Sequence, residues 1–540
     1  MKHYLYIMIA CLCVSLGVHA QRRSPEALRK LQMAEFAISQ LYVDSVDEDH
    51  LVEEAIIKML STLDPHSTYT NAEEVKEMTE PLKGGFEGIG VQFQMIQDTL
   101  LVIQPVSGGP SEKVGILAGD RIVAVNDTAI AGVKMKTEEI MSRLRGPKGT
   151  TVALTIVRRG VSDPVIFSVK RDKIPIFSLD ASYMIDDKHK IGYIRINRFS
   201  ATTAEEFLSA LKTLQKQGMR DLILDLQGNG GGYLNAAIDL ANEFLGQGEL
   251  IVYTEGRSSK RSDFHAQGDG HFRRGRLVVL VDEYSASASE IVSGAIQDWD
   301  RGVLVGRRTF GKGLVQRPID LPDGSMIRLT VARYYTPAGR CIQKPYDNTA
   351  NPDGTVKDAD GQQRYNQELI DRLNHGELMH ADSIRFPDSL KVATRRLGRT
   401  VYGGGGVMPD FFVPMDTARY SAYHRQLVAK GVVIRSIAQF IEHNRARLEK
   451  KYQKFDRFLE RFEIDEEFLQ QVRALADEEK IPFKQEEWDR SLPEIKQQLK
   501  ALVARDIWDM NEYYRVMNQT DQVVQTGLRV LLENKVEEML

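Results

Sequence analysis

Cysteine is scarce in this chain, and neither sign of charge is in excess. Three of the 540 residues are cysteines, so a fold stapled by disulfides is excluded. Seventy-one basic residues against seventy-five acidic ones give a formal net charge of −4, which provides no global field for nucleic acid or an anionic membrane. We therefore expect no nucleic-acid partner. The length exceeds a single hydrophobic core and predicts about two to four domains.

Long apolar runs are absent from the sequence except at its N-terminus. An apolar run over residues 4–18 is followed by Ala20 and then by the polar residues 21–23. This order is typical of a secretory signal peptide that is cleaved after Ala20. A membrane anchor is the alternative, although the run is shorter than the roughly twenty residues needed to span a bilayer. A lipoprotein site at Cys11 is a further alternative, but little apolar sequence precedes it. Export would leave Cys341 without a disulfide partner.

Hydrophobic spacing changes several times along the chain. Apolar residues recur at helical spacing over residues 25–41 and 49–63, and short β-type runs follow from residue 84. Buried-type strands such as 222–226 and 277–281 then alternate with helical runs, which indicates an α/β layer. The sequence therefore predicts a multidomain α/β protein. Its expected parts are a signal peptide (1–20), an N-terminal helical region (21–80), a β-rich module (81–174), an α/β core (175–415) with a surface insertion near 343–400, and a C-terminal helical domain (416–540).

Two glycine-rich stretches resemble nucleotide-binding loops. Residues 228–232 (GNGGG) join a strand to a helix, but Tyr233 stands where a dinucleotide fingerprint needs its third glycine. Residues 306–313 (GRRTFGKG) match a P-loop except at Gly313, which has no hydroxyl for a metal ion, and a strand follows instead of a helix. Neither loop therefore predicts a nucleotide. A glycine-rich loop can also aim backbone N–H groups at an oxyanion.

A nucleophile is available in the serine-rich segment that follows the strand 277–281. Ser285, Ser287 and Ser289 alternate with alanine or precede a helix start, where small neighbours leave a hydroxyl accessible and the helix N-terminus favours negative charge. Serines in this position are usually helix caps. The segment alone therefore does not decide whether these serines are helix caps or include a nucleophile.

A base for such a nucleophile is offered by lysine rather than by histidine. His265 and His271 lie in a polar loop that is typical of solvated surface. Lys312 lies instead among glycines and apolar residues, and a lysine in such surroundings can be neutral and act as a general base. Gln316, four residues further on, could orient the amine.

Five motifs of this sequence occur in the same order as in a known protein family. They are residues 64–67 (DPHS), 88–91 (GIGV), 224–232 (LDLQGNGGG), 287–291 (SASEI) and 306–316 (GRRTFGKGLVQ). Together they resemble the C-terminal processing, or tail-specific, peptidases, which use a Ser/Lys dyad. The resemblance extends from about residue 30 to about residue 410. It implies a crotonase/ClpP-like α/β peptidase core with an inserted PDZ domain.

The resemblance also assigns catalytic roles by residue. In the family the serine lies 25 residues before the lysine, which selects Ser287 as nucleophile and Lys312 as base, with Gln316 as orienter. The implied oxyanion hole is formed by backbone amides from the pair Gly231 and Gly232 and from Ala288, with the donating glycine left open. The loop departs from the common family pattern, which puts its rigidity in question. The departures are Gln227, Gly228 and Gly230, where Arg, Asn and Pro are usual.

The β-rich module is similar to a PDZ domain, in which consecutive N–H groups capture the terminal carboxylate of a peptide that adds as a strand. The residues expected to bind the peptide are Gly88, Ile89, Gly90 and Val91 in the carboxylate loop, and Phe93, Ile140 and Leu144 around its last side chain. The alternative is that the apolar residues among them pack in the core of the module and do not contact a peptide.

The sequence thus predicts an exported serine endopeptidase that recognises unstructured C-terminal tails through its PDZ domain. Its expected partners are proteins or peptides with free C-termini, and a homo-oligomer through the helical regions is a further expectation. No metal or organic cofactor is implied. The family points to the periplasm, with association to the membrane surface as a variant of that location. Two rivals are a PDZ scaffold or chaperone that does not cleave and a crotonase-like acyltransferase.

Overall fold

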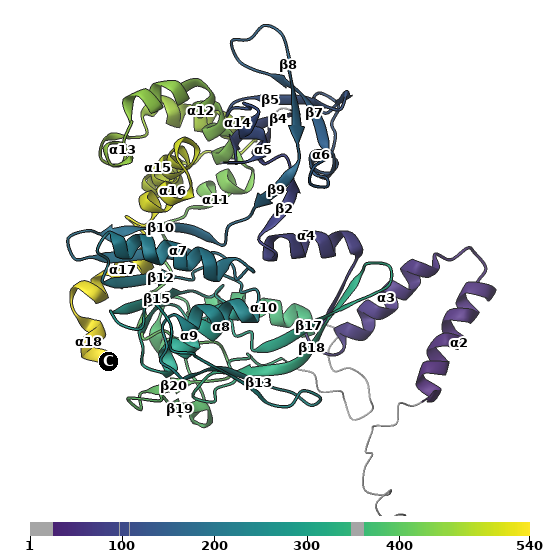
Figure 1. The fold of residues 1–540 in the computed structure, drawn as a ribbon, viewed down its shortest axis with the longest axis vertical. Coiled ribbons are helices and arrows are strands. Elements are labelled where there is room, and N and C mark those ends of the chain that lie inside the picture. Colours follow the sequence, from purple (N-terminus) through teal and green to yellow (C-terminus); the bar gives the residue numbers. More distant parts are fainter. Residues whose placement is uncertain (1–24, 97, 107, 347–360) are drawn as a thin grey trace, which may run out of the picture.

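The computed structural model describes residues 25–96, 98–106, 108–346 and 361–540. The predicted signal peptide and most of the turn-rich part of the predicted insertion lie outside these residues. The described chain forms an α/β core, a β-rich module above it, a group of C-terminal helices beside that module, and a helical hairpin that projects to one side (Figure 1). The prediction of a multidomain α/β protein with helical regions at both ends is confirmed.

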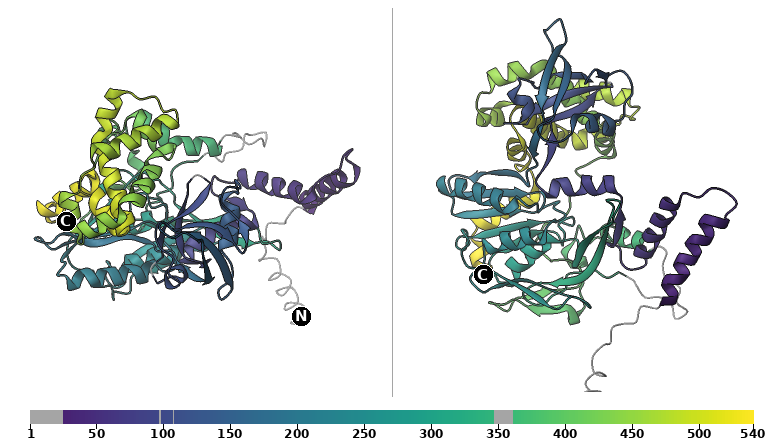
Figure 2. Two further views of the ribbon diagram at one scale, coloured as in Figure 1. Left: turned by 90° about the horizontal axis from the view of Figure 1, so that it is seen from above. Right: turned by 45° about the vertical axis from the view of Figure 1, so that its right-hand side comes forward.

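The projecting hairpin is made of α2 (Pro25–Leu41) and α3 (Glu48–Ser61), which confirms the two helices predicted near the N-terminus. Both views of Figure 2 show it standing away from the core, and large apolar side chains on it, such as Phe36, are exposed. After α3 the chain returns to the core, where β1 (Thr68–Thr70) pairs with a core strand and α4 (Ala72–Leu82) follows.

The β-rich module is joined to the core by an antiparallel ribbon of β2 (Gly85–Gly88) and β9 (Asp172–Pro175). Its sheet has the order β3-β4-β5-β7-β8, with β3 at an edge among the described strands. The strands are β3 (Val91–Ile96), β4 (Thr99–Pro105), β5 (Arg121–Val125), β7 (Thr151–Val157) and β8 (Val165–Lys170), with the short β6 (Thr128–Ala129) on β5. Two helices cover it, α5 (Pro110–Lys113) and α6 (Thr137–Leu144).

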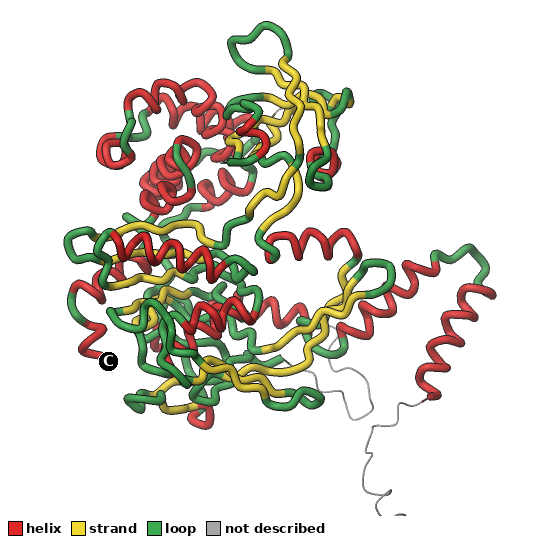
Figure 3. The backbone as a smooth tube through the Cα atoms, viewed as in Figure 1, coloured by secondary structure: helices red, strands yellow, loops and turns green. Residues whose placement is uncertain are grey.

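The core is built on a six-stranded sheet in the order β10-β11-β12-β15-β16-β21. All neighbours are parallel except β10 and β11, and the central strands are apolar on both faces because both faces are covered (Figure 3). The strands are β10 (Leu179–Asp186), β11 (Ile191–Ile196), β12 (Asp221–Asp225), β15 (Leu277–Val281), β16 (Val303–Gly306) and β21 (Phe411–Phe412). The helices α7 (Thr203–Lys216), α8 (Leu234–Asn242) and α9 (Ala288–Asp298) follow β11, β12 and β15 in turn.

A second sheet lies next to the first and carries the lysine segment. Its order is β1-β18-β13-β14, and β17 also pairs with β18. These strands are β13 (Leu250–Glu255), β14 (Ser262–His265), β17 (Leu314–Asp320) and β18 (Met326–Tyr335). Along the chain, the elements between β18 and β21 are α10 (Gly361–Asn374), two short 3-10 turns (Ala381–Ser383 and Asp388–Leu390), β19 (Lys391–Ala393) and β20 (Thr400–Tyr402).

The C-terminal helices fall into two groups that pack on different parts of the molecule. The first group has its own aromatic core and contacts the β-rich module, for example through an ion pair between Arg121 and Glu442 at 3.0 Å. It contains α11 (Ala422–Ala429), α12 (Val432–Lys451), α13 (Phe455–Arg461), α14 (Glu466–Glu478), α15 (Gln485–Ile507) and α16 (Met510–Met517). The second group, α17 (Gln522–Leu532) and α18 (Lys535–Met539), covers the far face of the core sheet. The left-handed Asn534, with φ of 54°, divides these two helices.

None of the helices within the described ranges is long and apolar enough to cross a membrane.

Candidate active site

Ser287 lies at a sharp turn between β15 and α9. Its φ of 56° is unusual for a residue other than glycine, and such a conformation costs on the order of 1–3 kcal/mol. The neighbouring serines have structural partners, because Ser285 Oγ donates to the Leu226 carbonyl and Ser289 Oγ to the Asn229 carbonyl, each at 2.8 Å. Both of these hydroxyls are buried. Ser287, in contrast, lines a cavity of about 490 Å³.

This cavity brings together all the predicted catalytic residues. Ser287 and Ala288 come from the start of α9, Lys312 from the loop before β17, and Gln316 from β17 itself. The glycine loop after β12 supplies another wall, and the end of α4 a third. One space in which a peptide bond could lie is thus lined by a serine, a lysine, a glutamine and backbone amides.

Glu290 ties the serine turn to the lysine loop. Its carboxylate is fully buried and accepts hydrogen bonds from the N–H of Ser287 at 2.8 Å, of Gly311 at 2.7 Å and of Lys312 at 2.8 Å, and from the Thr309 hydroxyl at 2.5 Å. Burial raises the pKa of Glu290, and these donors act against that rise. Sequence patterns assigned no role to Glu290, although it lies inside the motif SASEI.

The amine of Lys312 is held in surroundings that favour its neutral form. Burial and, to a smaller extent, the positive charge of Arg328 lower the pKa of Lys312 from 10.5 to about 8, and the charges of Glu290 and Asp64 act in the opposite direction. No hydrogen bond joins Lys312 Nζ to Ser287 Oγ or to any other described group. Catalytic hydrogen bonds are often long before substrate binds, so this geometry leaves both roles in place.

Gln316 is positioned by the motif DPHS, which comes from the N-terminal part of the chain. Gln316 Nε2 donates to the His66 carbonyl. The turn is held by the buried Asp64, whose carboxylate accepts from the N–H of His66 at 2.8 Å, the hydroxyl of Ser67 at 2.6 Å and the hydroxyl of Thr330 at 3.0 Å. Burial, followed by the charge of Lys312, lowers the pKa of His66 to about 4, so its ring is neutral at pH 7.

The two candidate glycines of the oxyanion hole differ in what their N–H groups do. The N–H of Gly231 donates to Asn229 Oδ1 at 2.9 Å and is therefore already used. The N–H groups of Gly232 and Ala288 have no acceptor among the described residues. Only glycine fits here, because a Cβ on Gly232 would lie 2.0 Å from the Phe199 carbonyl oxygen.

The glycine loop is held rigid despite its departures from the family pattern. Gly228 N–H donates to both carboxylate oxygens of Asp282 at 2.9 and 3.0 Å, and Arg195 donates to the Gln227 carbonyl at 2.8 Å. Asn229 Nδ2 donates to a carbonyl at the end of β11 at 2.9 Å. These contacts supply the restraint that Arg, Asn and Pro would otherwise be expected to give.

A second, smaller cavity of about 60 Å³ lies in the β-rich module, between β3 and α6. It is lined by Phe86, Ile89, Gly90, Val91, Phe93, Met141, Leu144 and Arg145. Five of the seven predicted peptide-binding residues are among these. Gly88 lies instead in β2, and Ile140 is fully buried in the module's core, because α6 turns Ile140 inward and presents Met141 to the cavity.

The loop at this cavity has free donors and an open strand beside it. Within the described ranges, the N–H groups of Ile89 and Gly90 have no acceptor. The edge strand β3 can pair with an added peptide strand. Arg145 at the rim forms an ion pair with Glu80 at 2.7 Å, and Glu80 belongs to α4, whose last turn lines the catalytic cavity.

Among the residues that the structure describes, no group of three or more His, Cys, Asp or Glu side chains is placed to hold a metal ion.

Models of known protein families match most parts of the chain. A model of peptidase family S41 matches residues 190–356, and a PDZ domain model matches residues 88–170. The N-terminal domain of the activating protease CtpB matches residues 14–74, and a family of unknown function matches residues 423–509.

Several curated proteins and solved structures are similar to the chain. The carboxy-terminal processing protease CtpA of Bacillus subtilis is 37% identical over 330 residues, which cover 61% of this chain and 69% of the relative. The carboxy-terminal-processing protease of Bartonella bacilliformis is 39% identical over 309 residues, which cover 56% and 69%. Among solved structures, a photosystem II D1 C-terminal processing protease is 31% identical and covers 59% of this chain and 91% of its own, with a TM-score of 0.34.

Proposed function

Because the chain belongs to the carboxy-terminal processing proteases of peptidase family S41, we propose that it cleaves substrates with a Ser287/Lys312 dyad and selects them by their free C-termini. That it is a serine-type protease with a PDZ domain follows from the family. The observation that carries the finer proposal is the convergence of Ser287, Lys312 and two unused backbone N–H groups on one cavity.

The proposed reaction begins with neutral Lys312. Its amine takes the proton of Ser287 Oγ as that oxygen attacks the peptide carbonyl carbon. The N–H groups of Gly232 and Ala288 stabilise the negative charge that develops on the carbonyl oxygen. Lys312 then gives its proton to the leaving amine, which departs and leaves an ester on Ser287.

Water completes the cycle in the same site. Lys312, neutral again, takes a proton from water as the water oxygen attacks the ester carbonyl. The second tetrahedral intermediate uses the same two N–H groups, and collapse returns the proton to Ser287. Gln316, fixed by the His66 carbonyl, is proposed to orient the lysine amine.

Substrate tails are proposed to bind at the PDZ domain. The terminal carboxylate would accept from the N–H groups of Ile89 and Gly90, and the peptide would extend along the edge of β3. The last side chain would enter the cavity that Phe93, Met141 and Leu144 line. Export to the periplasm is part of the proposal and rests on the signal-like pattern of residues 1–20. Assembly into a homo-oligomer through the helical regions stays a prediction.

Amidating the C-terminus of a peptide substrate should lower kcat/KM at sub-saturating concentration by about 10- to 150-fold, the equivalent of losing roughly 1.5 to 3 kcal/mol of charge-assisted hydrogen bonding. The cleavage site is identical in both peptides, so the difference reports the tail alone. The measurement is product formation from matched free and amidated peptides.

Gly90→Trp provides the matched protein control. Gly90 has a φ of 74°, and a Cβ there would lie 2.9 Å from Ile174, so a large side chain closes the loop. This variant should cut free and amidated peptides equally. Equal cleavage of both peptides by the unaltered protein would show that the module does not select termini. Binding of the peptides without any cleavage would support the scaffold instead.

A further inference from the structure

Arg328 places a positive charge in the catalytic cavity, and the described residues offer it no anionic partner. It is half-buried on β18 and lines the cavity together with Ser287 and Lys312. Its Nε and Nη2 both donate to the hydroxyl of Thr68, each at 3.3 Å. No carboxylate lies within 4.0 Å of its guanidinium among the residues that the structure describes. Burying such a group carries a desolvation cost, which the two hydrogen bonds to Thr68 offset only in part.

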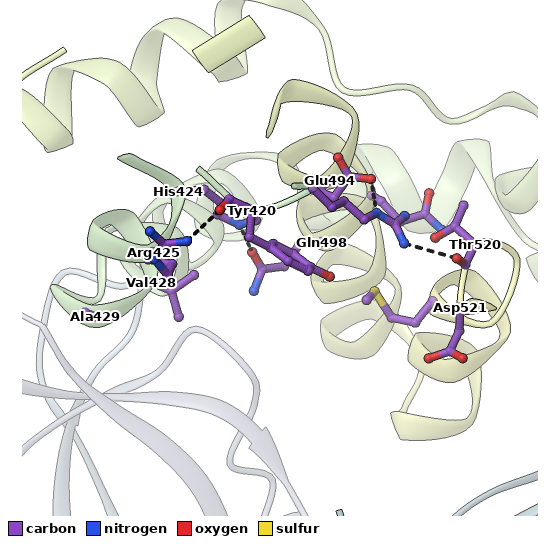
Figure 4. Close-up of a pocket in the computed structure, with 12 residues that line it drawn as sticks. Tyr420, His424, Arg425, Val428, Ala429, Glu494, Gln498, Thr520 and Asp521 are labelled. Carbon is purple, nitrogen blue, oxygen red and sulfur yellow. Dashed lines mark hydrogen bonds and ion pairs between the residues drawn. The ribbon is translucent and has the colours of Figure 1, made fainter. Parts of the chain in front are cut away.

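Other arginines withdrawn from water in this molecule do have partners. Arg340 is fully buried and forms an ion pair with Asp298 at 2.5 Å. Arg301 donates to three backbone carbonyls. In the cavity between the C-terminal helices, Arg419 is likewise bonded to Glu494 and to the Thr520 carbonyl. Glu494 and Thr520 are labelled in the close-up of this cavity (Figure 4). Arg328 departs from this pattern, and it does so beside the nucleophile.

The strand register explains why Arg328 faces the reacting groups. In the β17–β18 pair, Gln316 lies opposite Thr330 and Pro318 lies opposite Arg328. Opposed residues and residues two apart share a face of a sheet, so Arg328 and Gln316 are on the same face. On the other side, Thr68 of β1 is the direct partner of Arg328 and fixes its side chain.

We propose that Arg328 binds a carboxylate of the substrate chain close to the bond that is cut, and so determines cleavage-site specificity. The inference rests on the proposed function, because it needs a peptide in the cavity. A guanidinium held by Thr68 presents its remaining N–H donors to a carboxylate as a planar fork. The carboxylate belongs to an acidic side chain near the scissile bond.

Peptides of one sequence, with Glu or Gln at each position flanking the cut bond, test the inference, and each is prepared with a free and an amidated C-terminus. At one position, kcat/KM is expected to be about 10-fold or more higher for Glu than for Gln. The Glu preference should persist after amidation, because amidation removes the terminal carboxylate from both peptides of a pair and leaves their side chains unchanged.

Arg328→Gln is expected to remove the Glu-over-Gln ratio, and Arg328→Lys to keep part of it. The ratio is decisive because loss of this charge also raises the pKa of Lys312 and slows cleavage of all peptides at pH 7. Arg317→Gln is the matched control, since Arg317 is exposed on the neighbouring strand, and it should keep the full ratio. The same peptides are also measured for binding to the Ser287→Ala protein, which requires no cleavage.

Two outcomes overturn the inference. Cleavage of every Glu and Gln pair at equal rates, with equal binding to Ser287→Ala, shows that no acidic side chain is recognised, while the peptidase activity itself stands. A ratio that survives Arg328→Gln but is lost in Arg198→Gln assigns the site to the other arginine of the cavity, whose Nε donates to Asn197 at 2.8 Å. Failure of the unaltered protein to cut any peptide would instead contradict the proposed function.

Discussion

Ser287→Ala and Lys312→Ala should each lower kcat/KM for an unfolded protein substrate by about three orders of magnitude or more, because nucleophile and base act as one unit. Both side chains line the same cavity. The double variant should be no slower than either single one. Product formation measured by mass spectrometry gives all three rates.

Three variants serve as controls for that result. Ser285→Ala and Ser289→Ala remove hydroxyls that bond to backbone carbonyls, so they should lower stability more than chemistry. Lys312→Arg keeps the positive charge but cannot lose its proton, and it should be as inactive as Lys312→Ala. If Lys312→Ala retains more than about a tenth of the activity, or if Ser285→Ala is the slower of the serine variants, the dyad is assigned to the wrong residues.

Glu290→Gln should have the next largest effect. The carboxylate accepts four hydrogen bonds, and an amide in its place turns an NH₂ group toward two of the four donors. Leaving two buried donors unsatisfied lowers the free energy of unfolding by about 2–6 kcal/mol. The serine turn and the lysine loop lose their common anchor, so we expect kcat/KM to fall by about 100-fold or more. Denaturant unfolding and peptide hydrolysis measure the two effects.

Glu243→Gln separates lost stability from lost positioning. Glu243 is also buried, and it bonds to the N–H of His271 at 2.7 Å, away from the cavity. It should destabilise the protein without slowing cleavage at temperatures where the variant is folded. Equal activity of Glu290→Gln and Glu243→Gln would show that the anchor has no part in catalysis.

Local sequence patterns were sufficient to predict those features that depend on a single segment of the chain. The apolar strand at 277–281, the helical spacing over 25–41 and the order of the motifs led to the α/β core, the N-terminal helices and the family. Ser287 and Lys312 could be chosen because their spacing is a property of the family, and both lie in motifs of the sequence.

Long-range contacts could not be predicted in the same way. The amide of Gly231 is used by Asn229, which the spacing of glycines does not reveal. Gln316 is held by a turn 250 residues earlier in the chain, and only strand pairing brings the two together. Met141 lines the cavity where Ile140 was expected, because one helical residue step moves a side chain by about 100°.

The pH dependence of kcat/KM for an unfolded substrate tests the central claim, hydrolysis through a neutral lysine, most directly. A general base acts only when it has lost its proton, and the pKa of Lys312 is lowered to about 8. The rate should therefore rise about tenfold per pH unit below pH 8 and level off above it. A rate that is half-maximal near pH 6.5 and already constant at pH 7.5 would assign the base to a histidine and contradict this mechanism.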